Sequence, residues 1–529
     1  MIFDLSHRRE QAVLGVWLAQ HRLFRPVRSK PAKNPGQTPF PSRRIVHHSS
    51  CGIMFTVRMP NQSYPAMMNR GSLKLLMVAL ACPVLGVALV LAGCAAPAAT
   101  PTPAIPSPAS ATAAVSDTVV LPTAPPMAPT GTPEPSATPG AVLLTLPAGV
   151  RIQLSLWTVE AISPQAEGEV GPLFADMLRG FERAYPGVSV SVVLKNTSGR
   201  GSVLDYLRTA SVVAPSVLPD LVVLDTADLA AAARTGVLVP LDGEIAADLV
   251  ADLLPAARAA GTVHNQLLGI PFQMDVEHLI YNANQVSSVP LTWTDVLSAH
   301  TTLLFPAKGR NGLVNDAFTI QYLSLGGRFQ DDEGGPLLDE PALRAVLGYY
   351  QQAAQAGVLM REAALQAGDA QDVWSVYVSA RAGLAQVTAH RFLTGRQALR
   401  NTRFGDIPTR DGHPLTIGRG HLLAVLARDP LQQSLAMRLV EWWLRPDNNS
   451  VWNQTTHYLP TRYAAFQLWG NEDPYYPFLQ HLLEIAVPAP PAADYDPIAR
   501  VLQQAVLEVL RGESTPEQAA AAAVDAIVR

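Results

Sequence analysis

The side chains that could carry out chemistry occur without the spacing that the common catalytic motifs require. The 529-residue sequence contains no G-x-S-x-G, no H-E-x-x-H, no Gly-Lys pair that could close a phosphate-binding loop and no G-x-G-x-x-G after a strand pattern. The histidines downstream of residue 94 never reach metal-ligand spacing. Two carboxylates brought together by the fold would suffice for a glycosidase, so that activity stays open as an alternative. From these patterns we expect no catalytic residue, no metal and no cofactor.

Cysteine usage and charge narrow the possible functions further. All three cysteines, Cys51, Cys82 and Cys94, lie in the first 94 residues, which excludes disulfides, thiolate metal sites and cysteine nucleophiles from the remainder. Residues 1–93 hold 12 of the 39 Lys and Arg but 2 of the 43 Asp and Glu, so the remainder carries a formal net charge of −14. Because such an acidic body repels phosphate backbones, we expect no binding to nucleic acid.

The segment before Cys94 has the order of features found in a secretion signal. A short basic stretch at residues 68–74 precedes an apolar run at residues 75–91, and the segment ends in Leu-Ala-Gly-Cys at Cys94. This ending resembles the lipobox of bacterial lipoproteins, in which a peptidase cleaves before the cysteine and the thiol carries diacylglycerol. A transmembrane helix is the alternative, but about 17 apolar residues is at the lower limit for a span. We expect residues 67–93 to be a signal peptide and lipidated Cys94 to anchor the protein at the outer face of a bacterial cell membrane.

Two further segments of the N-terminal part are not expected to fold. Residues 1–66 show no sustained periodicity, and we interpret them as an extension upstream of the true start of translation. Residues 94–146 begin with the lipidated cysteine and continue as a tether, because residues 95–140 contain 12 Pro among Ala, Thr and Ser and no aromatic residue. Such a composition cannot bury enough apolar surface to fold, and it favours an extended spacer on the order of 100 Å long.

From residue 147 onward the pattern alternates between strands and helices. The predicted strands are 151–157, 188–194 and 221–224, and the predicted helices between and after them are 170–185, 202–213 and 228–234. Thr292 begins a capping box. Further helices are predicted near residues 316–325, 340–356, 430–444, 497–511 and 516–528. This alternation predicts an α/β fold with mostly parallel sheets flanked by helices.

Several short segments of this body follow one another in a characteristic order. They are Trp157-Thr158, Tyr185-Pro186-Gly187, Pro219-Asp220, Gly269-Ile270-Pro271, Tyr281-Asn282, Gly326-Gly327 and Tyr458-Leu459-Pro460. In this order, and over residues 150–465, the chain resembles the extracellular solute-binding proteins that feed ABC importers, in particular the branch that takes up sugars. Thr388-Ala389-His390 stands where many sugar-binding members have Gly-x-Trp.

The resemblance implies a periplasmic-binding-protein-like fold of type II, with two α/β lobes and a cleft between them. The solute-binding domain would span residues 147–529. Lobe 1 would comprise about 147–277 and 416–456, and lobe 2 about 284–405 and 457–529. The chain would cross between the lobes near 276–284, 405–417 and 455–460.

The resemblance also implies where the solute contacts lie, because open α/β sheets bind ligands at the carboxyl ends of their strands. Sugars require aromatic faces together with carboxylate, amide and guanidinium groups. The candidate ligand-binding residues are therefore Trp157, Thr158, Glu160, Asp225, Gln273, Asp275, Trp374, His390 and Arg419. A core position is the alternative for Trp157 and Trp374, and helix capping is the alternative for Asp225.

Function follows from the same resemblance. It implies a monomeric binding lipoprotein that captures a small solute of the carbohydrate class by closing its two lobes and delivers it to the permease subunits of an ABC transporter. Such a protein is not an enzyme. A surface glycosidase and a solute-sensing receptor lipoprotein are the alternatives.

Overall fold

The computed structural model describes residues 146–147, 149–379 and 381–528. The predicted N-terminal extension, the signal peptide, Cys94 and the tether up to residue 145 lie outside the described residues. Within the described part of the chain, no helix is both long enough and apolar enough to cross a membrane.

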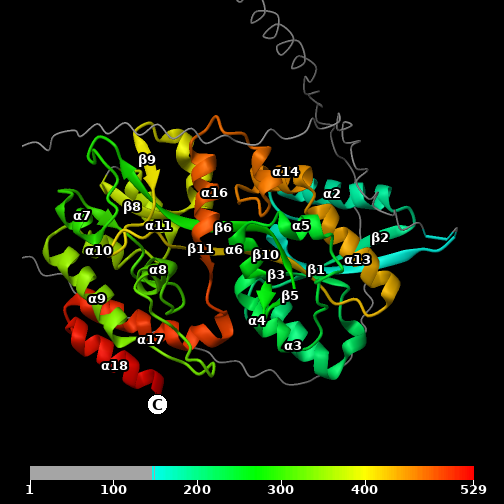
Figure 1. Ribbon diagram of the computed structural model, residues 1–529, viewed down its shortest axis with the longest axis horizontal. Coiled ribbons are helices and arrows are strands. Elements are labelled where there is room, and N and C mark those ends of the chain that lie inside the picture. Colours follow the sequence, from blue (N-terminus) through cyan, green and yellow to red (C-terminus); the bar gives the residue numbers. More distant parts are fainter. Residues whose placement is uncertain (1–145, 148, 380, 529) are drawn as a thin grey trace, which may run out of the picture. The chain divides into compact units, whose positions relative to one another are not determined.

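Three parallel strands form one end of the main sheet, in the first lobe (Figure 1). β1 (Ile152–Val159) pairs with β2 (Val188–Lys195) on one side and with β3 (Leu221–Asp225) on the other. The side chains of β1 and β3 alternate between two apolar clusters, so that Leu156 belongs to one cluster and Trp157 to the other. Both faces of this part of the sheet are therefore buried.

Helices cover the two faces. Side chains of α2 (Val170–Ala184), α13 (Pro430–Trp443) and α14 (Pro446–Thr456) pack in the cluster that contains Leu156. Those of α3 (Val203–Val213) and α4 (Leu229–Ala233) pack in the cluster that contains Trp157. Figure 1 shows α2 and α14 above the strands and α3 and α4 below them.

The turn from α2 into β2 depends on a glycine. Gly187 has a φ of +94°, a conformation that side-chain-bearing residues rarely adopt. A Cβ atom at this position would also lie 2.8 Å from the carbonyl oxygen of Val150. The Pro-Gly pair of the sequence thus ends the helix and lets β2 lie beside β1.

Two long strands carry the sheet into the second lobe. β10 (Thr416–Val425) runs antiparallel to β3 and to β6 (Ile270–Asn282). The far end of β6 pairs with β8 (Leu384–Thr388) and β9 (Thr402–Gly405). The strand order is β2-β1-β3-β10-β6-β8-β7, where β7 is Leu303–Leu304. The sheet is thus mixed rather than mostly parallel, because the crossing strands run opposite to their neighbours.

The second lobe has the largest apolar cluster, and its fully buried side chains include Tyr322, Tyr350 and Tyr475. Its main helices are α8 (Asp316–Ser324), α9 (Glu340–Gln355), α11 (Ala370–Tyr377), α12 (Ala389–Gly395), α17 (Ala492–Arg511) and α18 (Pro516–Val528). The prediction that α17 begins at Pro497 is wrong, since the helix begins at Ala492 and contains Pro497. Pro497 is the sixth residue of the helix, so it removes one intrahelical hydrogen bond, the one to the carbonyl of Ala493.

The other predicted elements agree with the structure to within one or two residues, and the capping box at Thr292 is confirmed. The remaining elements are η1 (Glu160–Ile162), η2 (Pro215–Val217), η3 (Thr226–Asp228), α5 (Ala247–Ala251), α6 (Pro255–Ala260), β4 (Thr262–Val263), β5 (Gln266–Leu267), α7 (Trp293–Ser298), α10 (Arg361–Ala364), η4 (Arg396–Ala398), α15 (Tyr463–Gln467), α16 (Tyr475–Ile485) and β11 (Ala486–Pro488).

The lobes also touch at a second place. Ala227 of η3 belongs to a small apolar cluster with Ile320 of α8 and Ala489. Beside it, Nη1 of Arg234 lies 2.9 Å from Oδ2 of Asp494. These contacts and the crossing strands together fix the lobes relative to each other in this conformation.

Candidate functional site

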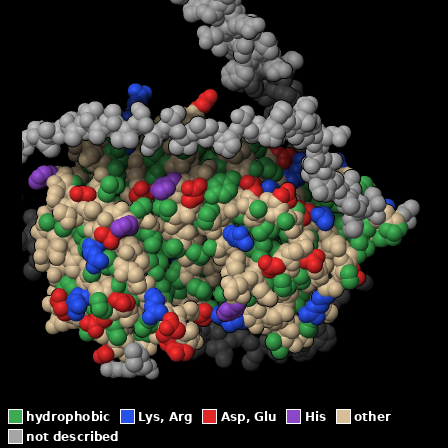
Figure 2. All heavy atoms as spheres, viewed as in Figure 1, with side chains coloured by type: hydrophobic (Ala, Val, Ile, Leu, Met, Phe, Trp, Pro, Cys, Tyr) green, Lys and Arg blue, Asp and Glu red, His purple; other side chains and the backbone are tan. Residues whose placement is uncertain are grey.

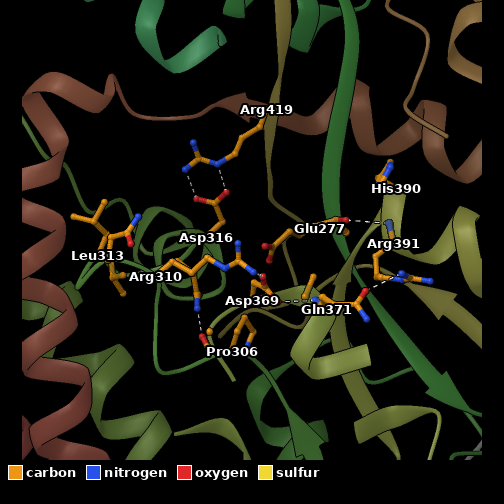
Figure 3. Close-up of a pocket in the computed structure, with 16 residues that line it drawn as sticks. Glu277, Pro306, Arg310, Leu313, Asp316, Asp369, Gln371, His390, Arg391 and Arg419 are labelled. Atoms are coloured by element: carbon orange, nitrogen blue, oxygen red, sulfur yellow. Dashed lines mark hydrogen bonds and ion pairs between the residues drawn. The ribbon is translucent and has the colours of Figure 1, made fainter. Parts of the chain in front are cut away.

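A cavity of about 630 Å³ lies where the crossing strands meet the second lobe (Figure 3). Its walls come from β6, β10, the carboxyl end of β8, and the beginnings of α8, α11 and α12. The lining residues are Glu277, Pro306, Arg310, Asn311, Leu313, Val314, Asn315, Asp316, Gly368, Asp369, Ala370, Gln371, Thr388, His390, Arg391 and Arg419. A ligand in an open α/β sheet is expected at such a position, next to the carboxyl ends of strands.

An ion pair between Arg419 and Asp316 forms one wall of the cavity. The guanidinium of Arg419 on β10 uses two nitrogens, with Nη2 2.7 Å from Oδ1 and Nε bonded to Oδ2. Asp316 is the first residue of α8, which the Asn315 side chain caps by accepting from the N–H of Ala317 at 3.0 Å. A carboxylate in the first turn is stabilised by the helix dipole. The side chain of Asp316 is 11% exposed and that of Arg419 is 41% exposed, so the arginine is the more accessible partner.

The other two arginines at the cavity are also held by the protein. Arg310 forms an ion pair with Asp369. Nη1 of Arg391 donates to Oε1 of Gln371 at 2.8 Å, and its guanidinium carbon lies 4.8 Å from the centre of the Trp374 ring. Figure 3 shows Arg310, Asp369, Gln371 and Arg391 at the lower edge of the cavity. Each cationic side chain therefore has a partner before any ligand binds.

Asp275 is a buried carboxyl on β6 that the backbone of the second lobe holds. Its Oδ1 accepts from the N–H of His390 at 2.9 Å and from the N–H of Val276 at 3.0 Å. Burial raises the pKa of Asp275 to about 6, and the hydrogen bonds oppose this rise. The bond to His390 joins the crossing strand to the first turn of α12.

Glu277 lies two residues further along β6 and therefore points to the same side of the strand. Its Oε2 accepts from Nε2 of Gln386 on β8. Figure 3 shows its carboxyl directed into the cavity, on the side of Asp316. Burial, followed by the charge of Asp316, raises the pKa of Glu277 to about 8. At neutral pH this carboxyl is therefore mainly protonated.

An aromatic pair lies beside these carboxyls. The rings of His390 and Tyr458 stack with their centres 4.5 Å apart and their planes at 30°. Burial lowers the pKa of His390 below its usual range, which favours the neutral imidazole. Burial, with smaller contributions from Asp275 and Asp225, raises the pKa of Tyr458 to about 12. Both rings are therefore uncharged at neutral pH.

The first-lobe candidates on β1 lie in a different environment. Trp157 is 6% exposed, its ring faces that of Tyr206 edge-on, and Nζ of Lys195 lies 4.2 Å from its centre. Thr158 is buried and donates to the carbonyl oxygen of Ile162 at 2.7 Å. Neither residue lines the cavity. In this conformation both contribute to the packing of the first lobe.

Glu160 and Asp225 follow β1 and end β3, and both are exposed. Oδ1 of Asp225 accepts from the N–H of Ala227 at 2.9 Å, so Asp225 caps η3. The register of β3 and β10 places Asp225 opposite His421, two residues from Arg419. Asp225 therefore combines a capping role with a position near the crossing strand.

Gln273 and Trp374 support the site from inside. Gln273 is 1% exposed, and its Nε2 lies 3.1 Å from Nδ1 of His421 while its Oε1 accepts from Nε1 of Trp452 at 2.7 Å. Trp374 is 7% exposed, packs in the large cluster of the second lobe and lies against Arg391. Both side chains therefore position their neighbours.

The structure brings some of the candidates together and leaves others apart. His390 and Arg419 line the cavity, and Asp275 binds the backbone of His390. Sequence reasoning missed Glu277, Asp316 and Arg391, which line the same cavity. Two features of the sequence could have identified these residues. Strand alternation places Glu277 on the same side as Asp275, and the Asn-Asp pair at Asp316 is typical of a helix start. Among the described residues, no group of three or more His, Cys, Asp or Glu could hold a metal ion.

The structure thus combines a mixed sheet through two lobes with a cavity at its crossing strands, a position where open α/β sheets bind ligands. The chain belongs to the family of bacterial extracellular solute-binding proteins, whose family model matches residues 177–475. No curated protein matches the sequence. The predicted membership of a solute-binding family is confirmed, and this family binds its solutes without catalysis.

Solved structures of sugar-binding proteins share the fold. The cyclic α-maltosyl-1,6-maltose binding protein from Arthrobacter globiformis is 19% identical, with 71% of this chain and 98% of that chain covered and a TM-score of 0.59. The sugar-binding protein MalE from Xanthomonas citri is 18% identical, with 71% and 97% covered and a TM-score of 0.60. An ABC transporter solute-binding protein from Thermotoga lettingae, bound with α-D-tagatose, is 21% identical, with 71% and 98% covered and a TM-score of 0.54. The predicted α/β binding-protein fold is confirmed.

Proposed function

We propose that the protein captures an uncharged carbohydrate in the cavity at its crossing strands and delivers it to the permease subunits of an ABC transporter. The observation that carries this proposal is a cavity of about 630 Å³, lined by polar residues and apolar surface, in which Arg310 and Arg419 are already paired with carboxylates of the protein. Its volume is within the range of small-molecule sites. The sugar-binding structures that share the fold support the carbohydrate class.

The pairing of charges favours a neutral solute. A charged solute that engaged either ion pair would have to draw Asp316 away from Arg419 or Asp369 away from Arg310, and would leave the other partner uncompensated. Arg391 binds a neutral amide and an aromatic face instead of a carboxylate. Paired guanidinium and carboxylate groups retain unused N–H donors and lone pairs, and sugar hydroxyls can bond to these without separating the charges.

Lobe closure would complete the site. The cavity belongs to the second lobe and the crossing strands, whereas Asp225 and Glu160 stand at the strand ends of the first lobe. A solute bound to both sides would stabilise the closed form, which then docks on the permease. We expect the binding protein to act as a monomer.

The outer surface carries charges of both signs. On the face shown in Figure 2, acidic and basic side chains are interspersed.

The proposed lipid on Cys94 and the tether that follows would hold the binding domain at the outer face of the cell membrane. Labelling of cells with a radioactive fatty acid tests this anchor, and Cys94→Ala should remove the label.

Isothermal titration calorimetry of the purified protein tests the capture of a neutral sugar. The panel would contain glucose, maltose, maltotriose, tagatose, glucosamine, glucuronate and spermidine. We expect binding among the neutral sugars, loss of that binding in Asp316→Ala, and unchanged binding in Asp332→Ala, whose exposed carboxylate lies in the same lobe and pairs with Arg328. If only glucosamine, glucuronate or spermidine bound, and no neutral sugar did, the proposal that the solute is uncharged would be contradicted. No heat with any compound would contradict capture.

A further inference from the structure

Three carboxyl groups surround one guanidinium at the inner wall of the cavity. Asp275 and Glu277 lie on β6, Asp316 begins α8, and Arg419 reaches them from β10. Nε and Nη2 of Arg419 bind Asp316, and Arg419 acts on Glu277 only through its charge. Arg310, the next cation along the cavity, is bound to Asp369. Arg391, the third arginine of the cavity, binds the neutral amide of Gln371. The four carboxyls Asp275, Glu277, Asp316 and Asp369 thus outnumber these three arginines by one, and a carboxyl that keeps its proton removes the imbalance.

The hydrogen bonds identify which carboxyl keeps the proton. Asp316 has a guanidinium as its partner, and Asp275 accepts two backbone N–H bonds that stabilise a charge. Glu277 accepts one bond, from the neutral amide of Gln386, and its carboxyl faces the cavity (Figure 3). The rise of its pKa to about 8, first through burial, agrees with this assignment.

We propose that the protonated carboxyl of Glu277 binds the solute as a hydrogen-bond donor, with the oxygen not bonded to Gln386 directed at an acceptor oxygen of the carbohydrate. This role rests on the proposed capture of a neutral sugar. An ionised Glu277 could only accept, and it would add a second negative charge beside Asp316. Solute binding is therefore linked to a proton that the site must retain, and it weakens as the medium becomes alkaline.

The groups that face Glu277 leave a pH window in which its titration can be observed. They come from β6, β8, α8, α9, α12, β10 and the loops around them, and are Asp275, Gln386, Thr388, Asp316, Tyr350, His390, Arg391, Arg419, Arg310 and Asp369. Asp275, with a pKa of about 6, is ionised above pH 7. Burial raises the pKa of Tyr350 well above its usual range, and burial lowers that of His390, so both stay neutral. Between pH 7 and pH 9, a change in affinity reports on Glu277.

Calorimetric titration with maltose and with tagatose at pH 7, 8 and 9 tests the proposal on the purified protein, Glu277→Gln and Glu333→Gln. For a group of pKa about 8, the affinity of the wild-type protein should fall about tenfold from pH 7 to pH 9. Glu277→Gln should bind at pH 7 and change less than about twofold over this range, because the amide donates without titrating. Glu333 is an exposed carboxylate of the same lobe, and its variant should follow the wild type.

A second measurement separates this role from the capture proposal. Carbon-detected NMR of the labelled glutamate carboxyls, assigned by comparison with Glu277→Gln, gives the pKa of Glu277 without any sugar. A pKa near 4.5, a wild-type affinity that does not change from pH 7 to pH 9, or a folded Glu277→Gln that no longer binds at pH 7 would overturn the donor role alone. Absence of binding by all three proteins at every pH would overturn the capture proposal and this role with it.

Discussion

The two sides of the cleft are built differently. On the side of the second lobe and the crossing strands, polar groups are partnered and largely shielded, as the Asp316 side chain shows at 11% exposure beside Arg419. On the side of the first lobe, Asp225 and Glu160 are exposed at strand ends, and Trp157 is packed in the core. One side is thus organised before a solute arrives, whereas the other exposes groups that, under the proposed function, would meet the solute on closure. Four predictions test this difference.

Trp374→Ala should have the largest effect. The ring is buried in the second lobe, so its removal should lower the free energy of unfolding by about 3–5 kcal/mol. It also supports the guanidinium of Arg391, so sugar affinity should fall as well. Trp157→Ala removes a ring of equal size from the first lobe. It should lower the free energy of unfolding by a similar amount and leave the cavity intact. Urea unfolding and calorimetry measure both. Equal affinities of the two variants would remove the distinction between the two sides.

Arg419→Met should come next. The substitution keeps much of the side-chain volume and leaves the shielded Asp316 carboxylate without its partner. We expect sugar affinity to fall by at least about 30-fold, equivalent to about 2 kcal/mol. The double variant Arg419→Met with Asp316→Leu removes the stranded charge and should recover stability without recovering affinity. Recovery of affinity in the double variant would show that the pair is structural.

The third prediction, with a smaller expected effect, concerns how the stability of the protein depends on pH. It tests Glu277, on the side of the second lobe and the crossing strands. Because the pKa of Glu277 is raised in the folded protein, the folded state binds more protons than the unfolded state between pH 4.5 and about 8. The stabilisation of the folded state by protonated Glu277 is therefore fully present below pH 4.5 and is lost as the pH rises towards 8. Thermal unfolding from pH 5 to pH 8.5 should show a shallower decline for Glu277→Gln than for the wild type. Parallel curves would indicate that Glu277 titrates normally in the fold.

Asp225→Ala should have the smallest effect and addresses the first lobe. Loss of the cap on η3 should lower stability by about 1 kcal/mol, and Asp225→Ser should restore it because serine can also accept from the N–H of Ala227. If Asp225 meets the solute on closure, both variants bind sugar less tightly, whereas a purely capping role predicts normal binding by Asp225→Ser. Calorimetry on the two variants distinguishes these roles.

The elements of the body could largely be predicted because their signals are local. The apolar repeat of α2 and the alternation of β1 are set by neighbours in sequence, and the structure confirms both. The capping box at Thr292 is equally local. The start of α17 was predicted wrongly because a proline that favours a helix start is also compatible with the early turns of a longer helix.

The site was predicted less completely because its contacts join distant parts of the chain. Arg419 was expected to contact solute, but Asp316, which lies 103 positions away, could not be identified as its partner from spacing. Trp157 was a candidate because it lies near a strand end, and the strand register turned its ring into the core. Glu277 was missed because a lone glutamate in a strand shows no sign of the carboxyls that surround it.

The sequence by itself determined the family, the α/β body and the order of its elements, since periodicity, caps and short motifs depend on residues that are close along the chain. The tertiary structure alone decided which charges are neutralised and which carboxyl keeps its proton. Those properties depend on burial and on distances between β6, α8 and β10, and both exist only after the crossing strands have brought these elements together.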